Sequence, residues 1–161
     1  YANLCMFRQL DTVLKEEKKM KTNEIMITSF DYEMIINMLL KMRESLTKEQ
    51  KDNADKLVIE IKRAYKVDPY EIPSDYVTMN SIFEIQEVDK NETRKISLVY
   101  PNKANIDEKK ISVLSPVGTA VLGYRTGEII HWKVPAGYKK FKISKMIYQP
   151  EASGKYYNKN E

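Results

Sequence analysis

Two apolar stripes with helical spacing follow each other almost directly in this sequence, and they constrain the fold more than any other feature. The first stripe runs from Ile35 to Leu46, on a helix expected over about 31–45, and the second lies between Gln50 and Tyr65. Thr47, three residues before Gln50, forms a capping-box pattern, in which hydroxyl and amide satisfy free N–H groups at a helix start. Helices joined so closely bury their apolar sides together, so the sequence predicts an antiparallel helical hairpin, a short coiled coil. The stripe residues are Ile35, Leu39, Met42 and Leu46, followed by Ala54, Leu57, Ile61 and Ala64.

The segments on either side of the hairpin define its limits. Pro69 and Pro73 end the second helix, because proline lacks an amide hydrogen and disfavours helical angles in the residue before it. On the other side, an apolar face between Leu4 and Leu14 predicts a short amphipathic helix, and the stretch 24–29 is expected to be extended. We therefore expect three parts. These are an N-terminal extension at residues 1–21, the hairpin at 22–71 and a C-terminal domain at 72–161.

The C-terminal domain carries the period-two alternation of half-buried strands. Val77 to Gln86 alternates apolar and polar side chains, and four further stretches have strand-like composition. Ser115 and Pro116 begin a short helix as N-cap and first helical residue, and Gly123 follows its end. The sequence therefore predicts an α+β protein whose C-terminal part is a small antiparallel sheet of four to five strands with one short helix. The further expected strands are Ile96–Tyr100, Lys110–Leu114, Ile129–Val134 and Phe141–Tyr148, the last two joined by a hairpin turn at 135–138.

Composition excludes several kinds of site. The chain has one cysteine, Cys5, and one histidine, His131, so it forms no internal disulfide and lacks the spacing pattern of a zinc site. No apolar stretch approaches the roughly 20 residues that span a membrane, and the first residues lack the order of an export signal. We therefore expect a cytoplasmic protein with no metal, no cofactor and no membrane contact.

Positive charge is concentrated towards the C-terminal end. Residues 133–161 contain seven lysines and two glutamates, although the whole chain has a net charge of only +4. One interpretation is a nucleic-acid-binding surface, on which nearby tyrosines stack on bases. The other is a solvated strand face followed by a basic tail. The candidate basic surface consists of Lys139, Lys140, Lys142 and Lys145.

Several short motifs occur in an order that is typical of a known family. They are Asp75–Ser81, Leu98–Pro101, Ile111–Gly118, Ala120–Gly123, Gly127–Glu128 before Ile130–Trp132, and Tyr148–Ala152. From about residue 22 to residue 157, the chain resembles the Rnk family, regulators of nucleoside diphosphate kinase, within the superfamily of Gre transcription elongation factors. The resemblance implies an FKBP-like C-terminal domain and an N-terminal coiled coil. It also implies binding to RNA polymerase at the coiled coil on the rim of the secondary channel, with any nucleic-acid contact being indirect.

The loop before the short helix is the contact site that the resemblance implies. In Gre factors this loop contacts the rim of the channel, and here it consists of Leu114, Ser115 and Pro116. Gre relatives usually carry Asp or Asn at the position of Leu114, so a polar contact to the rim is expected to be missing. The segment from Tyr1 to Met20 has no counterpart in the family pattern.

The predicted hairpin is too short for the chemistry of Gre factors. Those proteins stimulate RNA cleavage with acidic residues at the tip of a long coiled coil, which help to hold Mg²⁺ in the polymerase active site. Here the first helix has about 15 residues and a length of roughly 22 Å, about half of a Gre arm. The tip candidates are Glu44, Glu49 and Asp52. Basic residues lie between them, so ion pairing on a solvated helix end explains them equally well. The resemblance and the short hairpin together imply a non-enzymatic regulator that competes with Gre factors without cleaving the transcript.

Two other functions stay open, a nucleic-acid-binding module and a peptidyl-prolyl isomerase. The FKBP-like fold is shared with isomerases, whose activity needs an aromatic-lined pocket, and the candidates for it are Trp132, Tyr124 and Tyr138. His131 suggests a general base, but no acid or nucleophile lies at a sequence spacing that indicates a catalytic partner. We expect the neighbouring Trp132 to pack in the core. Three methionines at helical spacing are also expected to fill the core. They are Met34, Met38 and Met42.

Overall fold

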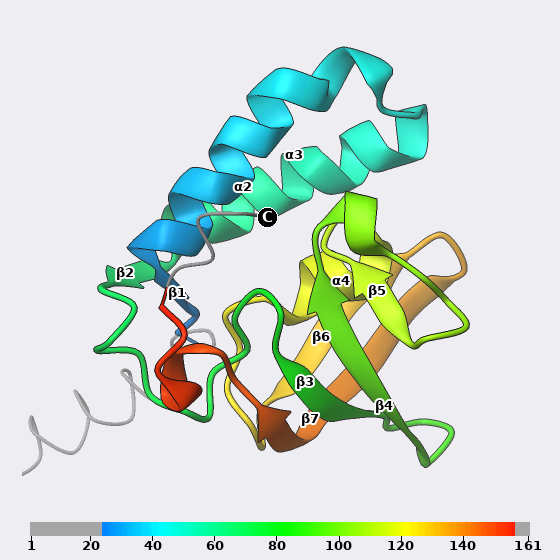
Figure 1. Cartoon of the computed structure of the whole chain (residues 1–161). Coiled ribbons are helices and arrows are strands. Elements are labelled where there is room, and N and C mark those ends of the chain that lie inside the picture. Colours follow the sequence, from blue (N-terminus) through cyan, green and yellow to red (C-terminus); the bar gives the residue numbers. More distant parts are fainter. Residues whose placement is uncertain (1–23, 157–161) are drawn as a thin grey trace, which may run out of the picture.

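The structure, a computed structural model, describes residues 24–156 and has the α+β architecture that the sequence predicts. Figure 1 shows the long helices beside a curled sheet, with a short helix between them and the sheet. The helix expected between Leu4 and Leu14 lies outside the described residues. The first half of the fold contains β1 (Met26–Thr28), α2 (Ser29–Met42), the 3₁₀ turn η1 (Arg43–Ser45), α3 (Lys48–Arg63) and β2 (Tyr65–Val67).

Both long helices begin at side-chain caps that the sequence encodes. Thr28 caps α2, where its Oγ1 accepts a hydrogen bond of 3.0 Å from the amide of Asp31. At the start of α3, Thr47 and Gln50 form the predicted capping box, each side chain accepting from the other residue's amide. Since such caps satisfy amides that have no partner within the helix, they fix where each helix starts. The expected first helix, 31–45, instead ends its α-helical part at Met42 and finishes as a 3₁₀ turn.

A small parallel ribbon, which the sequence did not predict, closes the base of the helix pair. Strand β1 pairs with β2, and Met26 lies opposite Tyr65. The second helix was expected to continue to Tyr65, but it ends at Arg63 and the backbone of Ala64 is extended. The amide of Tyr65 then donates to the carbonyl of Ile25 over 2.9 Å. Strands of three residues give no readable alternation, so the long-range pairing, rather than local pattern, determines them.

The C-terminal part is built on one five-stranded sheet with the order β5-β4-β3-β7-β6. The prediction of a purely antiparallel sheet is wrong, because β4 and β5 are parallel. The connection between them contains the 3₁₀ turn η2 (Pro101–Lys103) and a bridge from Asn105 to Lys110, and it carries the chain back so that β5 runs in the direction of β4. The strands are β3 (Ile82–Glu87), β4 (Glu92–Val99), β5 (Lys110–Ser112), β6 (Ile129–Val134) and β7 (Gly137–Tyr148).

The expected strand from Val77 to Gln86 starts later than predicted. Strand β3 begins only at Ile82, and the preceding residues form a turn in which the amide of Ser81 donates to the carbonyl of Thr78 over 3.2 Å. Asn80 adopts a positive φ of 63° there. Val77 and Met79 are nevertheless buried, so the alternation reports which side chains enter the core and not the backbone conformation.

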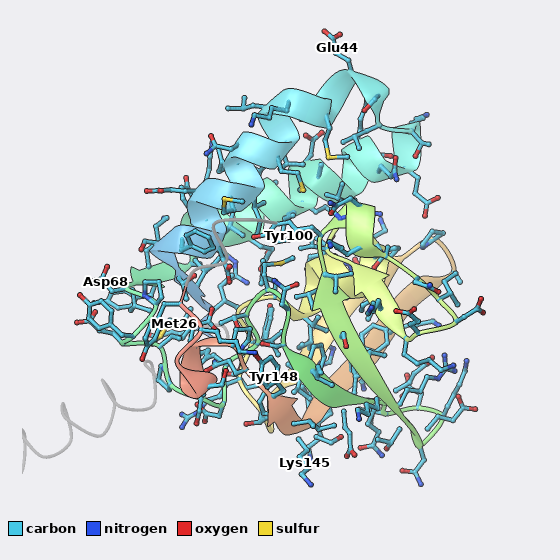
Figure 2. The ribbon with its side chains drawn as sticks, in the orientation of Figure 1. Met26, Glu44, Asp68, Tyr100, Lys145 and Tyr148 are labelled. Carbon is cyan, nitrogen blue, oxygen red and sulfur yellow. The ribbon has the colours of Figure 1, made fainter. Side chains whose placement is uncertain are left out.

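One hydrophobic core joins the helices to the sheet. Buried residues form a single cluster that runs from Ile25 through Leu57 of α3 to Ile143 of β7. Trp132 packs against this cluster as predicted, and neighbouring His131 is exposed. Figure 2 shows side chains filling the space between the helices and the sheet. Within residues 24–156, no helix has both the length and the hydrophobicity needed to cross a membrane.

Candidate functional site

The loop before the short helix α4 (Pro116–Val121) is held rigidly by its own hydroxyl groups. Ser115 is the N-cap: its Oγ accepts from the amide of Gly118 over 3.0 Å and donates to the carbonyl of Ser112 over 2.7 Å. The Oγ of Ser112 accepts from the amide of Leu114 over 3.0 Å. Because each of these bonds ties a loop atom to a regular element, the loop presents Ser115 and Pro116 in a defined position.

Gly118 allows α4 to approach strand β5 closely. A Cβ atom at this position would lie 2.0 Å from the carbonyl oxygen of Ser112, well inside van der Waals contact. Only glycine therefore fits without a backbone shift. The close approach sets the distance between the α4 loop and the sheet edge.

Leu114 has a different role from its two neighbours. Its side chain is only 2% exposed and belongs to the core, whereas Ser115 and Pro116 are half-buried. Its carbonyl oxygen accepts a hydrogen bond of 3.0 Å from the buried amide Nδ2 of Asn53 on α3. Leu114 thus offers no side-chain surface to a partner, and its backbone links the loop to the helix pair.

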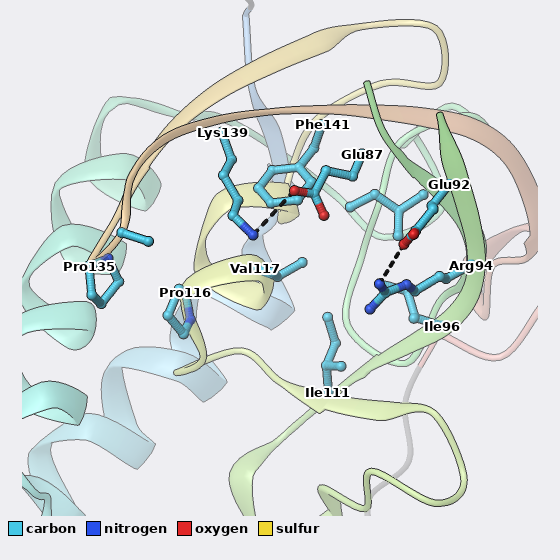
Figure 3. A pocket seen from close by; sticks show the side chains of 12 residues that line it. Glu87, Glu92, Arg94, Ile96, Ile111, Pro116, Val117, Pro135, Lys139 and Phe141 are labelled. Atoms are coloured by element: carbon cyan, nitrogen blue, oxygen red, sulfur yellow. Dashed lines mark hydrogen bonds and ion pairs between the residues drawn. The ribbon is translucent and has the colours of Figure 1, made fainter. Parts of the chain in front are cut away.

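An apolar groove, which we call the sheet groove, opens beside this loop. It has a volume of about 390 Å³ and lies on the concave face of the sheet, where Pro116 and Val117 of α4 form one wall (Figure 3). Its floor consists of side chains from four strands that point to the same face. The apolar lining residues are Ile85, Ile96, Ile111, Pro116, Val117, Pro135, Ala136 and Phe141.

Charged pairs border the sheet groove. Lys139 Nζ lies 3.2 Å from Glu87 Oε1, and Arg94 Nη2 lies 2.8 Å from Glu92 Oε2 (Figure 3). Partial desolvation acts to raise the pKa of Glu87, but the ammonium groups of Lys139 and Lys90 together hold it below its usual value. The border is therefore charged but locally neutral, and the interior is apolar.

The aromatic residues expected in an isomerase pocket lie elsewhere. Phe141 is the aromatic residue that lines the sheet groove, and neither Trp132, Tyr124 nor Tyr138 does. Tyr124 is buried, and its hydroxyl accepts from Arg63 Nη2 over 3.3 Å. Sequence reasoning missed the groove because its lining comes from strands far apart in the chain. The one feature of the sequence that could have indicated this groove was Pro116 followed by an apolar residue.

The three acidic tip candidates are exposed and do not gather into a metal site. Glu44 lies in η1 and points away from the molecule in Figure 2, while Glu49 and Asp52 lie on the first turns of α3. Among the described residues, no group of three or more potential ligands from His, Cys, Asp and Glu could hold a metal ion. Near the tip, Arg43 pairs instead with Asp55, with 2.9 Å between Nη2 and Oδ1.

A second groove, the junction groove, lies where α2 meets the C-terminal part and has a volume of about 630 Å³. Two carboxyl groups stand in it. Asp31 Oδ2 accepts from the amide of Met79 over 3.0 Å, and Glu151 Oε2 accepts from Thr78 Oγ1 over 2.7 Å. Burial, and then the charge of Glu151, raise the pKa of Asp31 to about 7. Burial likewise raises the pKa of Glu151.

Three methionines of α2 that were expected in the core line this groove, although Met38 and Met42 also pack against the core.

The four lysines of the candidate basic surface divide between two faces of the sheet. Lys139 lies on the concave face and pairs with Glu87, as described above. Lys140 and Lys142 lie in register with His131 and Ile129, which are exposed on the opposite face. Lys145 is also exposed and points away from the sheet in Figure 2.

This chain is similar to several known proteins. The family model for "Transcription elongation factor, GreA/GreB, C-term" matches residues 72–148. The regulator of nucleoside diphosphate kinase from Escherichia coli (strain K12) is 42% identical over 104 residues, which are 64% of this chain and 76% of that protein. Transcription elongation factor GreA from Alkaliphilus oremlandii (strain OhILAs) is 32% identical over 95 residues, which are 59% of this chain and 60% of that protein.

A solved structure agrees with these sequence matches. The prokaryotic transcription elongation factor GreA/GreB from Nitrosomonas europaea has a TM-score of 0.61 and 37% sequence identity, and the match covers 79% of this chain and 100% of that chain. The family match at residues 72–148 includes both the α4 loop and the lining of the sheet groove.

Proposed function

This chain belongs to the GreA/GreB family of transcription elongation factors, and we propose that it regulates transcription by docking on RNA polymerase at the rim of the secondary channel. The observation that carries the proposal is the position of the α4 loop beside the sheet groove. Hydrogen bonds hold Ser115 in place, and the next residue, Pro116, is itself a wall of the groove. The site that the family resemblance implies thus coincides with an apolar recess.

The chemistry of the recess fits a protein partner. Protein interfaces typically have an apolar centre surrounded by a polar rim, and residues anchored in such a pocket contribute most of the binding energy. Here the centre is formed by side chains such as Ile111 and Phe141, and the rim by the Glu87–Lys139 and Glu92–Arg94 pairs. We propose that an apolar side chain from the rim coiled coil enters the groove while the loop contacts its flank.

The helix pair would then lie over the channel mouth. Helix α2 has 14 residues, a length of about 21 Å at 1.5 Å per residue. The acidic residues at the tip do not form a cluster. The hydrogen bond from Asn53 to Leu114 links α3 to the α4 loop. We propose that the protein competes with Gre factors for the rim without stimulating transcript cleavage, and that it is not an enzyme.

We also propose the division into a helical hairpin at 22–71 and an FKBP-like domain at 72–161, preceded by an extension at 1–21. The continuous core between the two described parts supports a fixed orientation between them. Peptidyl-prolyl isomerase activity is the alternative function, since the sheet groove is apolar and lies on the sheet. Its single aromatic lining residue, Phe141, makes it the weaker of the two.

A binding assay with core RNA polymerase tests the proposal. The purified protein is immobilised, and capture of the polymerase is compared for the wild type and for Pro116→Arg, which places a charge at the wall of the groove. Ile59→Arg is the matched control, because Ile59 is 64% exposed on α3, away from the groove. We expect Pro116→Arg to lose capture, Ile59→Arg to keep it, and a Gre factor to displace the wild type.

Two results would oppose the proposal. Equal capture by wild type and Pro116→Arg would exclude the groove as the docking site. No capture of polymerase by a folded wild type would exclude the polymerase as partner, and a peptide assay for isomerase activity would then test the alternative.

A further inference from the structure

The outer, convex face of the sheet carries a regular array of lysines. Because directly paired residues in neighbouring strands share a face, the register identifies its members. Lys145 of β7 pairs with Glu84 of β3, which in turn pairs with Lys95 of β4. Phe83, Ile85 and Phe141 point inward, so the residues that alternate with them point outward. We call this array the outer lysine face, and it consists of Lys95, Lys133, Lys140, Lys142 and Lys145.

The charges of this face are not neutralised within the part of the chain that the structure describes. None of its five lysines makes an ion pair with a described residue, and Glu84 is the one carboxylate in register among them. On the concave face, by contrast, Lys139 and Arg94 are each paired with a glutamate. The two sides of one sheet thus differ in charge, and a surface of this kind attracts polyanions.

The other residues of the face favour nucleic acid over an acidic protein. Protein interfaces have a centre depleted of charge, whereas nucleic-acid interfaces are more polar and much more positive. Here lysines predominate at the centre, beside exposed Ile129 and His131. Tyr138 lies at one end, in register with Lys133 and 76% exposed. An exposed ring beside a row of cations is the combination with which proteins hold single strands, by stacking on bases and pairing with phosphates.

We propose that the outer lysine face binds single-stranded nucleic acid, with the lysines contacting phosphates and Tyr138 stacking on a base. The face points away from the sheet groove, so a strand on it and a protein partner in the groove can be bound together. This inference stands on the sheet alone and does not depend on polymerase binding.

Fluorescence anisotropy with a labelled single strand of about 20 nucleotides tests the inference, measured over a series of salt concentrations. The test variant is Lys140→Gln/Lys142→Gln/Lys145→Gln, and the matched control is Lys48→Gln/Lys62→Gln/Lys103→Gln, which removes the same charge from exposed positions elsewhere. Since each phosphate contact contributes about 0.7 to the slope of log K against log salt, we expect the test variant to lower the slope by about 2. The control should keep the wild-type slope. Tyr138→Ala should weaken binding without changing the slope.

Three outcomes would overturn the inference. The first is no binding by the wild type at low salt. The second is an equal loss of slope in the test and control variants, which would indicate net charge and no defined site. The third is binding of a poly-glutamate peptide as tight as that of the single strand, which would assign the face to an acidic protein.

Discussion

Asn53 and Leu114 lie 61 positions apart in the chain, and the Asn53 side-chain amide donates a hydrogen bond of 3.0 Å to the Leu114 carbonyl oxygen. Both groups are buried. The bond fixes α3 against the loop that we propose as the polymerase contact. The orientation of the helix pair and the shape of the α4 loop therefore depend on one another.

The first prediction concerns this bond. Asn53→Ala leaves the Leu114 carbonyl buried without its side-chain partner, which costs about 1–3 kcal/mol of unfolding free energy. Denaturant unfolding measures the loss, and faster hydrogen exchange of amides around Ser115 would show that the loop has loosened. Asn37→Ala, at an exposed position of α2, serves as control for the change in helix propensity; it should neither lower the free energy of unfolding nor loosen the loop. An unaltered free energy of unfolding in Asn53→Ala would contradict the structural role.

A second prediction tests the close approach of α4 to β5. Gly118→Ala puts a methyl group against the Ser112 carbonyl, and the backbone shift that relieves the clash should cost about 1–3 kcal/mol or more. Gly127→Ala is the comparison, since its added Cβ meets nothing within 4 Å and only the positive φ of 87° is penalised. Polymerase capture should fall in the Gly118 variant alone. Equal effects of both substitutions would mean that steric contact at Gly118 is unimportant.

The third prediction is a pH dependence of stability set by Asp31. Its folded pKa of about 7 lies above the ordinary value of 3.8, so the folded protein keeps a proton that the unfolded chain releases. Its contribution to stability is therefore greatest below about pH 4 and is lost as the pH rises to about 7. Asp31→Asn removes the charge and keeps an oxygen for the amide of Met79, so it should flatten this part of the profile.

Thermal melts from acid to mildly alkaline pH measure the effect of Asp31. The variant should gain stability relative to wild type near pH 8, by an amount on the order of a few kcal/mol. Asp52→Asn, at an exposed position on α3, should keep the wild-type profile. Parallel curves for wild type and Asp31→Asn would show that the carboxyl group is not the source, and Glu151→Gln would then be the next variant to measure.

The fourth prediction concerns metal binding at the tip. Because Glu44, Glu49 and Asp52 do not form a cluster, millimolar Mg²⁺ should raise the melting temperature no more than a matched ionic strength of NaCl. Glu44→Gln/Glu49→Gln/Asp52→Asn should behave in the same way. A Mg²⁺-specific increase that the triple variant abolishes would establish a site, and would reopen the question of transcript cleavage.

Sequence reasoning succeeded where the signal was local. The capping box of Thr47 and Gln50, the N-cap Ser115 and the turn at Gly123 each depend on residues within one turn of the chain, and all appear in the structure. The family resemblance was carried by similar short motifs, and the comparisons confirm it.

Features set by long-range pairing could not be predicted in this way. The parallel pairing of β4 with β5 depends on how the chain between Val99 and Lys110 returns, and the β1–β2 ribbon joins segments that are almost 40 residues apart. The sheet groove has the same origin, since its floor is assembled from several strands. The sequence also could not show which face of the sheet each lysine between Lys139 and Lys145 occupies. The strand register shows that Lys139 lies on a different face from the others.

The β1–β2 ribbon also makes the arm adjustable. It holds the entry to α2 and the exit from α3 next to each other, with Met26 opposite Tyr65, so the base is independent of how far the helices extend. Adding about seven residues to each helix, two turns on both sides, would lengthen the arm by about 10 Å and leave the ribbon unchanged. Reach is therefore a property that evolution or a protein engineer can alter in steps of whole turns, separately from the surface that we propose as the docking site.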